Sequence, residues 1–299
     1  MGYSARYHAA SLVAVFVALA AGILIGVGFG SDLVSGTAED LEQSLEADLN
    51  QARAEIEDLE AKLDTEREFG EAVAPAIVAD RLRGREIAIV ALGDLDPELA
   101  DDIRAGVESA GAALQEIAVV TAPPDTAAAA DAVRDQGVRN EPRGAALTRA
   151  AERAGRALVR GGDRFPELRS ALFGRYSGEP GDIDGVVIVR GRPEELSPRD
   201  AADTDRVEEG IIEGIASVGP PGPTMVGVER TDTDPSSIEF FSDRGAASVD
   251  NVDELPGRVA LVYTLDGAAG AFGVKETADA LLPDLLVRAG LGFGAGARD

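Results

Sequence analysis

The most constraining feature of this sequence is an uncharged, apolar run of 23 residues near its amino terminus, residues 9–31. A helix rises about 1.5 Å per residue, so this run reaches about 35 Å and can cross a hydrocarbon core of about 30 Å. Between Arg6 and Asp32 the only ionisable side chain is His8. We therefore predict a transmembrane helix over residues 9–31.

The charges that flank this run predict its orientation. Arg6 and the free amine precede it, whereas Asp32, Glu39 and Asp40 follow it. The positive-inside rule then places residues 1–8 in the cytoplasm and the bulk of the chain outside it. A cleaved signal peptide is the alternative, because residues 18–20 read Ala-Leu-Ala and fit a cleavage pattern. Cleavage there would leave the apolar residues 22–29 exposed, which favours a retained single-pass anchor.

Small residues recur every four positions along the predicted transmembrane helix. Such a stripe lets two membrane helices approach closely, although Gly and Ala are also simply common in membrane helices. Both interpretations stay open for the stripe, which comprises Ala14, Ala18, Gly22, Gly26 and Gly30.

Residues 38–71 predict a short coiled coil. They contain no proline, no glycine precedes Gly70, and apolar residues follow one another at alternating spacings of four and three. Ile56 at an a position beside Leu59 at a d position favours two parallel strands, and an anchor at the same end of each chain also requires parallel alignment. We predict a parallel homodimer, the alternative being one amphipathic helix packed on its own downstream domain. The seam comprises Leu45, Leu49, Ala52, Ile56, Leu59 and Leu63.

Residues 85–299 predict an extracytoplasmic α/β domain. Short, wholly apolar strands alternate with helical stretches, a pattern typical of a parallel sheet covered by helices on both faces. We expect a three-layer domain of Rossmann-like or flavodoxin-like type. The predicted strands are 86–92, 117–120, 185–190, 224–228 and 259–263, and the predicted helices are 97–110, 144–159, 201–217 and 235–243.

Ligands of such domains usually bind at the carboxyl ends of the strands, and no known motif stands there. The first strand is followed by residues 93–98, Gly-Asp-Leu-Asp-Pro-Glu, which lack the G-x-G-x-x-G fingerprint and place acid where a phosphate would lie. The glycine-rich residues 267–275 fit neither a P-loop nor the dinucleotide spacing, so a structural loop is favoured over phosphate binding. Asp182 and Asp184 resemble half a calcium loop, but a turn before a strand is the better interpretation.

Composition narrows the chemistry further. The chain has no cysteine, one histidine, two methionines and two lysines, with a formal net charge of −26. A nucleic-acid interface needs a basic face, so nucleic acid is not expected as a partner. The only histidine lies at the membrane edge, so we predict neither a catalytic triad nor a metal or cofactor site, and no enzyme. Glu208, Glu209 and Glu213 are expected on the solvent face of a helix.

Two segments carry a family resemblance. Residues 6–22, with residues 26–32, resemble the opening of the actinobacterial copper transport protein B (MctB) family. Residues 252–265, with the glycine-rich loop that follows, are similar to the carboxyl-terminal segment of that family. The resemblance implies an envelope protein with a role in copper homeostasis or transport, described for the family as an outer-membrane channel.

The residues also leave a second class of function open. Copper(I) prefers thiolate or thioether ligands and copper(II) prefers imidazole, and residues 85–299 offer only Met225. The family further resembles a corynebacterial envelope protein that acts in cell separation by engaging a regulator of cell-wall hydrolysis. The alternative is therefore a non-enzymatic, dimeric coiled-coil scaffold that regulates cell-wall hydrolysis or cell separation through an envelope protein partner.

Overall fold

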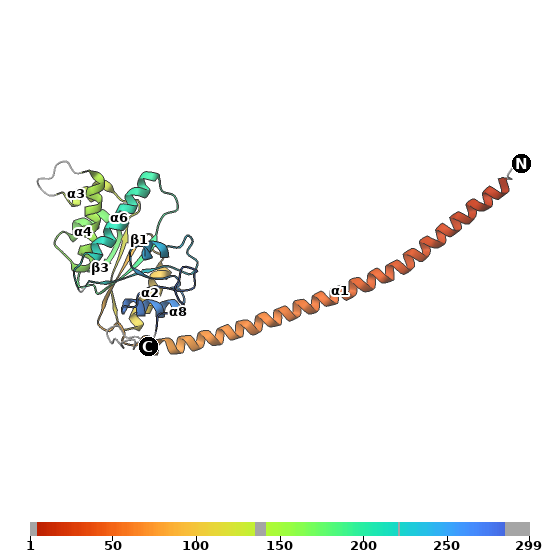
Figure 1. The fold of residues 1–299 in the computed structure, drawn as a ribbon, viewed down its shortest axis with the longest axis horizontal. Coiled ribbons are helices and arrows are strands. Elements are labelled where there is room, and N and C mark those ends of the chain that lie inside the picture. The colour runs from red at the N-terminus through yellow and green to blue at the C-terminus, as the bar shows by residue number, and fades with distance from the viewer. Residues whose placement is uncertain (1–4, 135–141, 221, 285–299) are drawn as a thin grey trace, which may run out of the picture. The chain divides into compact units, whose positions relative to one another are not determined.

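A computed structural model describes residues 5–134, 142–220 and 222–284 of the chain (Figure 1). The chain divides into two compact units, one ending at Phe69 and one beginning at Gly70. Helix α1, Ala5–Val78, is 74 residues long, and its last turns belong to the second unit. The predicted membrane and coiled-coil segments are thus joined without a break in the helix. Residues 285–299 of the predicted domain lie outside the described residues.

Residues Tyr7–Gly26 of α1 are long and apolar enough to cross a membrane, with a mean hydropathy of 2.5. Their side chains are exposed, as expected of side chains that face lipid. Within the stripe of small residues, a Cβ on Gly22 or Gly26 would meet no atom within 4 Å. Gly30 lies outside the residues whose surroundings are described. Helix pairing through this stripe stays a prediction.

The predicted coiled-coil seam lies on a continuous part of α1. Leu49 is 50% exposed and Leu45 is 59% exposed, and the other large seam residues fall between these values. A row of half-exposed leucines costs hydrophobic free energy in water unless something covers it. The parallel homodimer that would cover it stays a prediction.

The second unit is built on a seven-stranded sheet in the order β3-β2-β1-β4-β5-β6-β7. All neighbouring strands run parallel except β2 and β3, which are antiparallel, so the sheet is mixed rather than wholly parallel. The predicted strands at 86–92, 117–120, 185–190 and 224–228 are confirmed. The strands are β1 Glu86–Gly93, β2 Ala113–Val120, β3 Phe173–Gly178, β4 Gly185–Gly191, β5 Thr224–Val228, β6 Ala247–Val249 and β7 Ala271–Phe272.

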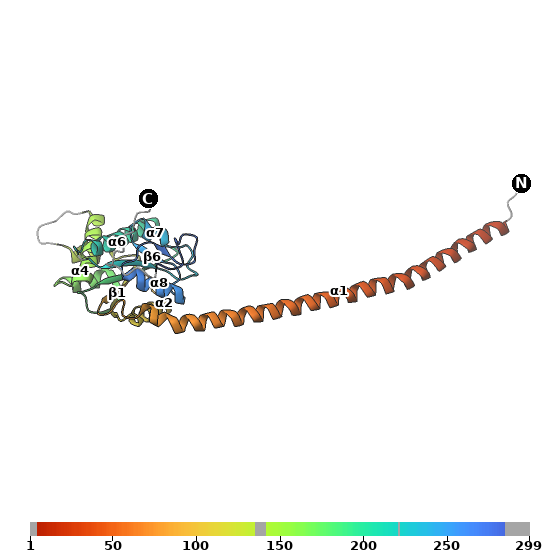
Figure 2. The same ribbon diagram turned by 60° about the horizontal axis from the view of Figure 1, so that its bottom comes forward.

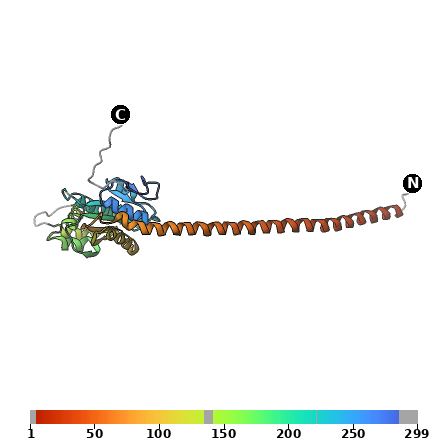
Figure 3. The same ribbon diagram turned by 90° about the horizontal axis from the view of Figure 1, so that it is seen from below.

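Helices cover both faces of the sheet and give the predicted three layers (Figure 2). Side chains alternate along β1, so Ala88 and Val90 face one helix layer while Ile87 and Ile89 face the other. The first layer holds α3 Thr126–Ala132, α4 Arg143–Arg160, α5 Phe165–Leu172, α6 Pro198–Ala216 and α7 Ile238–Ser242. The second layer, seen from below in Figure 3, holds α2 Pro97–Ser109, α8 Leu255–Leu265 and the end of α1.

The end of α1 is part of the second core. Ala74 and Val78 are buried with Leu82, which follows the helix directly. The Tyr263 hydroxyl donates to the Ile77 carbonyl at 3.4 Å, and the Arg81 guanidinium lies 3.6 Å from the centre of the Tyr263 ring. These contacts fix the junction between α1 and β1 against α8.

The predicted strand at 259–263 is wrong, because these residues form the middle of helix α8. A short apolar run does not distinguish a buried strand from a buried helix. Pro256 stands in the first turn, where its fixed φ favours a helix start. Residues 259–265 are all buried, so this helix is apolar on every side and shows no amphipathic period.

Glycines bring α4 and α6 into backbone contact (Figure 1). A Cβ on Gly155 would lie 2.2 Å from the Ile211 carbonyl oxygen, and a Cβ on Gly214 would lie 2.2 Å from the Glu152 carbonyl oxygen. Such distances are far inside van der Waals contact, so any larger residue must push the two helices apart. The close approach buries the α4 leucines against the sheet.

Gly214→Ala is expected to destabilise the α/β unit by about 1–3 kcal/mol, because the added methyl overpacks a backbone contact. Urea unfolding of the full chain in neutral detergent, followed by near-ultraviolet circular dichroism of Tyr176 and Tyr263, measures the loss. Gly219→Ala is the control, since a Cβ there would meet no atom within 4 Å. Equal midpoints for the two variants would contradict the packing argument.

Candidate functional site

The carboxyl edge of the sheet is the candidate site, because open α/β sheets bind ligands where the strand order reverses. That reversal falls between β1, which leads to β2, and β4, which leads to β5 on the other side. A cavity of about 720 Å³ lies at this point. Its lining comes from the ends of β1, β2 and β4 and from the start of β3, and includes Gly93, Asp94, Thr121, Arg175, Gly191 and Arg192.

Two glycines shape the floor of this cavity. A Cβ on Gly93 would lie 2.1 Å from the Gly191 carbonyl oxygen, and a Cβ on Gly191 would clash with the Asp94 carbonyl oxygen. The Asp94 N–H donates to the Gly191 carbonyl at 2.6 Å. In a dinucleotide site, glycines at this place make room for a pyrophosphate. Here they make room for a neighbouring backbone instead.

Asp94 and both arginines of the cavity already have partners in the chain. Arg175 Nη2 lies 3.6 Å from Asp94 Oδ1 and donates to the Leu95 carbonyl at 3.1 Å. Arg192 pairs with Asp205 at 2.7 Å and donates to the Ala201 carbonyl at 3.0 Å. The arginines therefore stabilise the loops after β1 and β4, and the cavity has a mixed, internally balanced charge.

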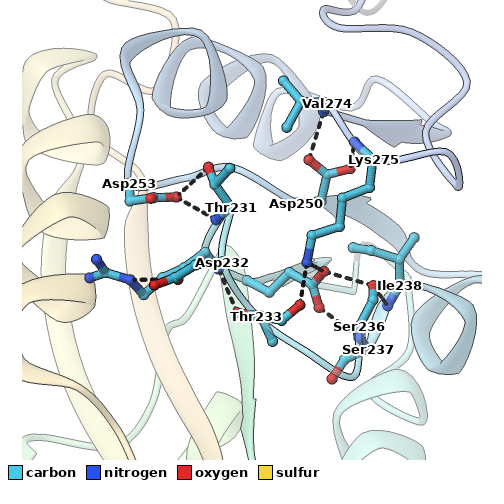
Figure 4. A network of polar contacts seen from close by, with 12 residues as sticks. Thr231, Asp232, Thr233, Ser236, Ser237, Ile238, Asp250, Asp253, Val274 and Lys275 are labelled. Atoms are coloured by element: carbon cyan, nitrogen blue, oxygen red, sulfur yellow. Dashed lines mark hydrogen bonds and ion pairs between the residues drawn. The ribbon is translucent and has the colours of Figure 1, made fainter. Parts of the chain in front are cut away.

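A buried polar network closes the same edge at β5, β6 and β7 (Figure 4). Glu229 follows β5 and is 4% exposed, and Lys275 Nζ donates to its Oε1 at 2.6 Å and to the Thr233 carbonyl at 2.7 Å. The Ser236 hydroxyl and the Ser237 N–H donate to the two Glu229 oxygens at 2.7 and 2.6 Å. The buried Glu229 carboxylate is thus paired with Lys275 and hydrogen-bonded at both oxygens, as burial of a charge requires.

The glycine-rich loop is held by a second carboxylate of this network. Asp250 follows β6, is fully buried, and accepts the N–H groups of Val274 and Lys275 at 2.7 and 3.0 Å. A Cβ on Gly273 would clash with Asp250 Oδ1, so glycine is required there. The amides and the ammonium that a phosphate would use are occupied by the chain's own carboxylates. This geometry favours the structural loop over a phosphate loop.

Glu229 and Asp250 are buried carboxylates at the candidate site that the sequence patterns did not predict. Each is the first residue after an apolar strand, which is the signal that could have found them. The strand before Glu229 was predicted, so this signal was available for Glu229. It was lost for Asp250 because β6 has only three residues. Residues 252–265, which resemble the carboxyl-terminal segment of the MctB family, contact the same edge of the sheet. Asp253 in this segment accepts hydrogen bonds from the N–H and the hydroxyl of Thr231, in the loop after β5, at 2.8 and 3.1 Å.

Lys275→Met is expected to destabilise the chain by about 3 kcal/mol, because it leaves the Glu229 carboxylate buried without its cation. Lys62→Met is a matched control, since the Lys62–Asp58 pair is about two-thirds exposed and such pairs contribute little. Urea unfolding of the full chain, monitored as above, gives both values.

The double variant Lys275→Met/Glu229→Gln is expected to recover part of the loss, because it removes the unpaired charge. A double variant that is less stable than Lys275→Met would contradict the assignment of Lys275 as the counter-ion.

Two further carboxylates, Glu208 and Glu116, are buried between the helices and the sheet. Glu208 is 2% exposed and pairs with Arg190 at 3.0 Å, so the predicted solvent-facing position of Glu208 is wrong. The Arg190 guanidinium, near the end of β4, also stacks over the Phe240 ring. Glu208 points inward because it pairs with this partly buried guanidinium. Burial raises the pKa of Glu208, and Arg190 offsets part of the rise. Glu209 pairs with Arg244 at 3.2 Å, and Glu213 is exposed as expected.

Of these two carboxylates, Glu116 on β2 has the more strongly raised pKa. It is 1% exposed, accepts the Tyr176 hydroxyl at 2.6 Å, and leaves its Oε1 without a hydrogen-bond partner. Burial raises the pKa of Glu116 to about 7 although the Tyr176 hydrogen bond lowers it. The folded chain therefore holds this proton more tightly than the unfolded chain does, so ionisation of Glu116 destabilises the fold.

The Glu116→Gln variant is expected to gain stability relative to the parent as the pH rises. Below the unfolded pKa of about 4.5, the free energies of unfolding of parent and variant differ least. Between pH 4.5 and about 7, the parent loses on the order of 3 kcal/mol of its free energy of unfolding, whereas the variant does not. Urea midpoints from pH 4 to pH 8 measure the difference. Glu213→Gln is the exposed control, and a stability gap independent of pH in Glu116→Gln would contradict this account.

Metal ligands do not gather in the part of the chain that the structure describes. No group of three or more His, Cys, Asp or Glu side chains there is placed to hold an ion. The predicted turn at Asp182 and Asp184 is confirmed: Asp182 has a φ of 58°, and Asp184 Oδ2 accepts the Glu86 N–H at 3.0 Å.

These features define a doubly wound α/β domain that follows an apolar helix and whose sheet edge is closed largely by its own ion pairs. A family model described as "Copper transport outer membrane protein, MctB" matches residues 3–283. The chain belongs to this family, as its two resembling segments indicated. Two relatives, each named "Copper transporter MctB", come from Mycobacterium bovis and Mycobacterium tuberculosis. Each is 25% identical over 322 residues, covering 92% of this chain and 97% of the relative.

Proposed function

We propose that this chain is a single-pass envelope protein with a copper-related role. The family match over residues 3–283 carries this proposal, because it spans the apolar segment, the predicted coiled coil at residues 38–71 and the α/β domain together. The relatives named as copper transporters align over 97% of their length and 92% of this chain, which supports a similar role for the whole chain. The apolar helix supports membrane association, and Arg6 before it and the acids after it favour a cytoplasmic amino terminus.

Copper enters this proposal as cargo rather than as a resident cofactor. Soft ligands are scarce: the sequence has no cysteine, His8 lies at the start of the candidate membrane span, and Met225 packs against the core. Carboxylates are plentiful, but they are hard ligands that hold copper(I) poorly. We propose that the chain acts non-enzymatically, through assembly and protein contacts in the envelope. Neither the fold nor the relatives supports the alternative of a scaffold for cell-wall hydrolysis or cell separation.

Deletion of the gene tests the copper-related role. The copper content of deletion cells, measured by mass spectrometry after growth in added copper, is expected to differ from that of the parent strain. A plasmid that encodes the full chain should restore the parental content, whereas one that encodes residues 70–299 behind a cleavable leader should not. Unchanged copper content with lengthened cell chains would overturn the proposal in favour of a role in cell separation.

Metal titration tests the status of copper as cargo. The full chain in neutral detergent is expected to compete with a copper(I) chelator no better than a carboxylate-rich control protein does, because thiolate and imidazole ligands are lacking. Copper(II) binding should be weak and of high stoichiometry. A single tight site of one copper per chain would contradict this part of the proposal.

A further inference from the structure

Helix α4 carries a charge opposite to that of the chain. The chain has a net charge of −26, yet Arg143–Arg160 contains five arginines and a single acidic residue, Glu152. Arg160 stands in the last turn, where a cation complements the helix dipole, but Arg153 and Arg156 stand earlier and are not explained in this way. A local excess of cations in so acidic a protein calls for a separate physical reason.

Four of the arginines in this region line one cavity. A hollow of about 470 Å³ lies where α4 gives way to α5, and its volume falls in the range of small-ligand sites. Arg153, Arg156 and Arg160 follow one another at spacings of three and four, so they share one face of the helix. Arg164 faces the same hollow from the loop, and Asp163 is the one acidic residue among its lining residues.

The positive charge of Arg156 and Arg160 is not neutralised within the described part of the chain. Arg156 donates from Nε and Nη2 to the Ser217 hydroxyl at 3.1 and 3.0 Å, so a neutral oxygen positions its guanidinium. Arg160 is exposed and makes no ion pair with the described residues. Elsewhere arginines meet carboxylates, as in Arg258–Asp102 and Arg81–Asp266, both at 3.1 Å.

We propose that this hollow, the α4–α5 arginine pocket, binds an anion that carries phosphate. Guanidinium groups present paired donors that match the oxygens of a phosphate, and several of them around one cavity can bind more of these oxygens than a single carboxylate offers. Ala157, Phe165 and Leu168 supply apolar walls against which the rest of the ligand can pack. The pocket lies apart from the carboxyl edge of the sheet, and the proposal does not depend on the copper-related role.

Calorimetric titration of the full chain in neutral detergent tests the pocket. Pyrophosphate and inorganic phosphate represent a free phosphate, glycerophosphoglycerol represents a lipid headgroup, and acetate represents a carboxylate. Saturable binding of at least one phosphate probe is expected, weakening as ionic strength rises. Preference for pyrophosphate would indicate a free phosphate as the ligand, and preference for the diester would indicate a headgroup.

Arg156→Gln/Arg160→Gln is expected to raise the dissociation constant at least about tenfold, since each lost charge-assisted hydrogen bond weakens binding strongly. Arg83→Gln/Arg199→Gln changes the net charge equally, at two exposed arginines outside the pocket, and should leave the constant nearly unchanged. Both double variants should keep the parental urea midpoint, because all four side chains are exposed. The proposal is overturned if no phosphate probe binds saturably, if acetate binds as tightly, or if the two double variants bind alike.

Discussion

Burial of the central strands on both faces is the constraint on which the rest of the domain depends. β1 and β4 carry almost no polar side chain, so neither face of the sheet can meet water. Helices must therefore cover both faces: α2, which follows β1, lies on one face, and α6, which follows β4, lies on the other. This change of face puts the reversal of strand order, and its cavity, between β1 and β4.

Because the central strands are buried on both faces, the polar backbone groups at their carboxyl ends must find partners within the protein. Parallel strands end together, and their terminal polar groups and loops must be satisfied at one edge. Gly93 and Gly191 allow two backbone segments to contact each other closely, and the Asp250 carboxylate accepts hydrogen bonds from loop amides. Much of what looks like a ligand site is therefore occupied by the protein itself. The α4–α5 arginine pocket differs because a neutral hydroxyl, not a carboxylate, holds Arg156.

Sequence patterns predicted those elements whose pattern was long or unambiguous. Four strands, the helices at 97–110, 144–159 and 201–217, and the three layers followed from apolar runs and helical periodicity. The helix at 255–265 was taken for a strand, because a fully buried helix loses its amphipathic signal. The antiparallel strand β3 was missed because its residues are mostly exposed and include Gly174 and Gly178. Glu208 on α6 points inward because it pairs with Arg190 on β4. Residue spacing along a helix does not predict an ion pair with another element, so the burial of Glu208 was missed.

The last turns of α1 have a consequence for how the domain can be separated from its anchor. Ala74 and Val78, with Leu82 just beyond, belong to the core that α2 and α8 also build. A fragment that begins at residue 85, directly before the first strand, would lack these three side chains and expose apolar side chains of α2 and α8. A soluble fragment must begin at or before Gly70, and the base of the helix then unfolds cooperatively with the sheet rather than fraying as a free end. Proteases that release the domain from a membrane should accordingly cut before residue 70.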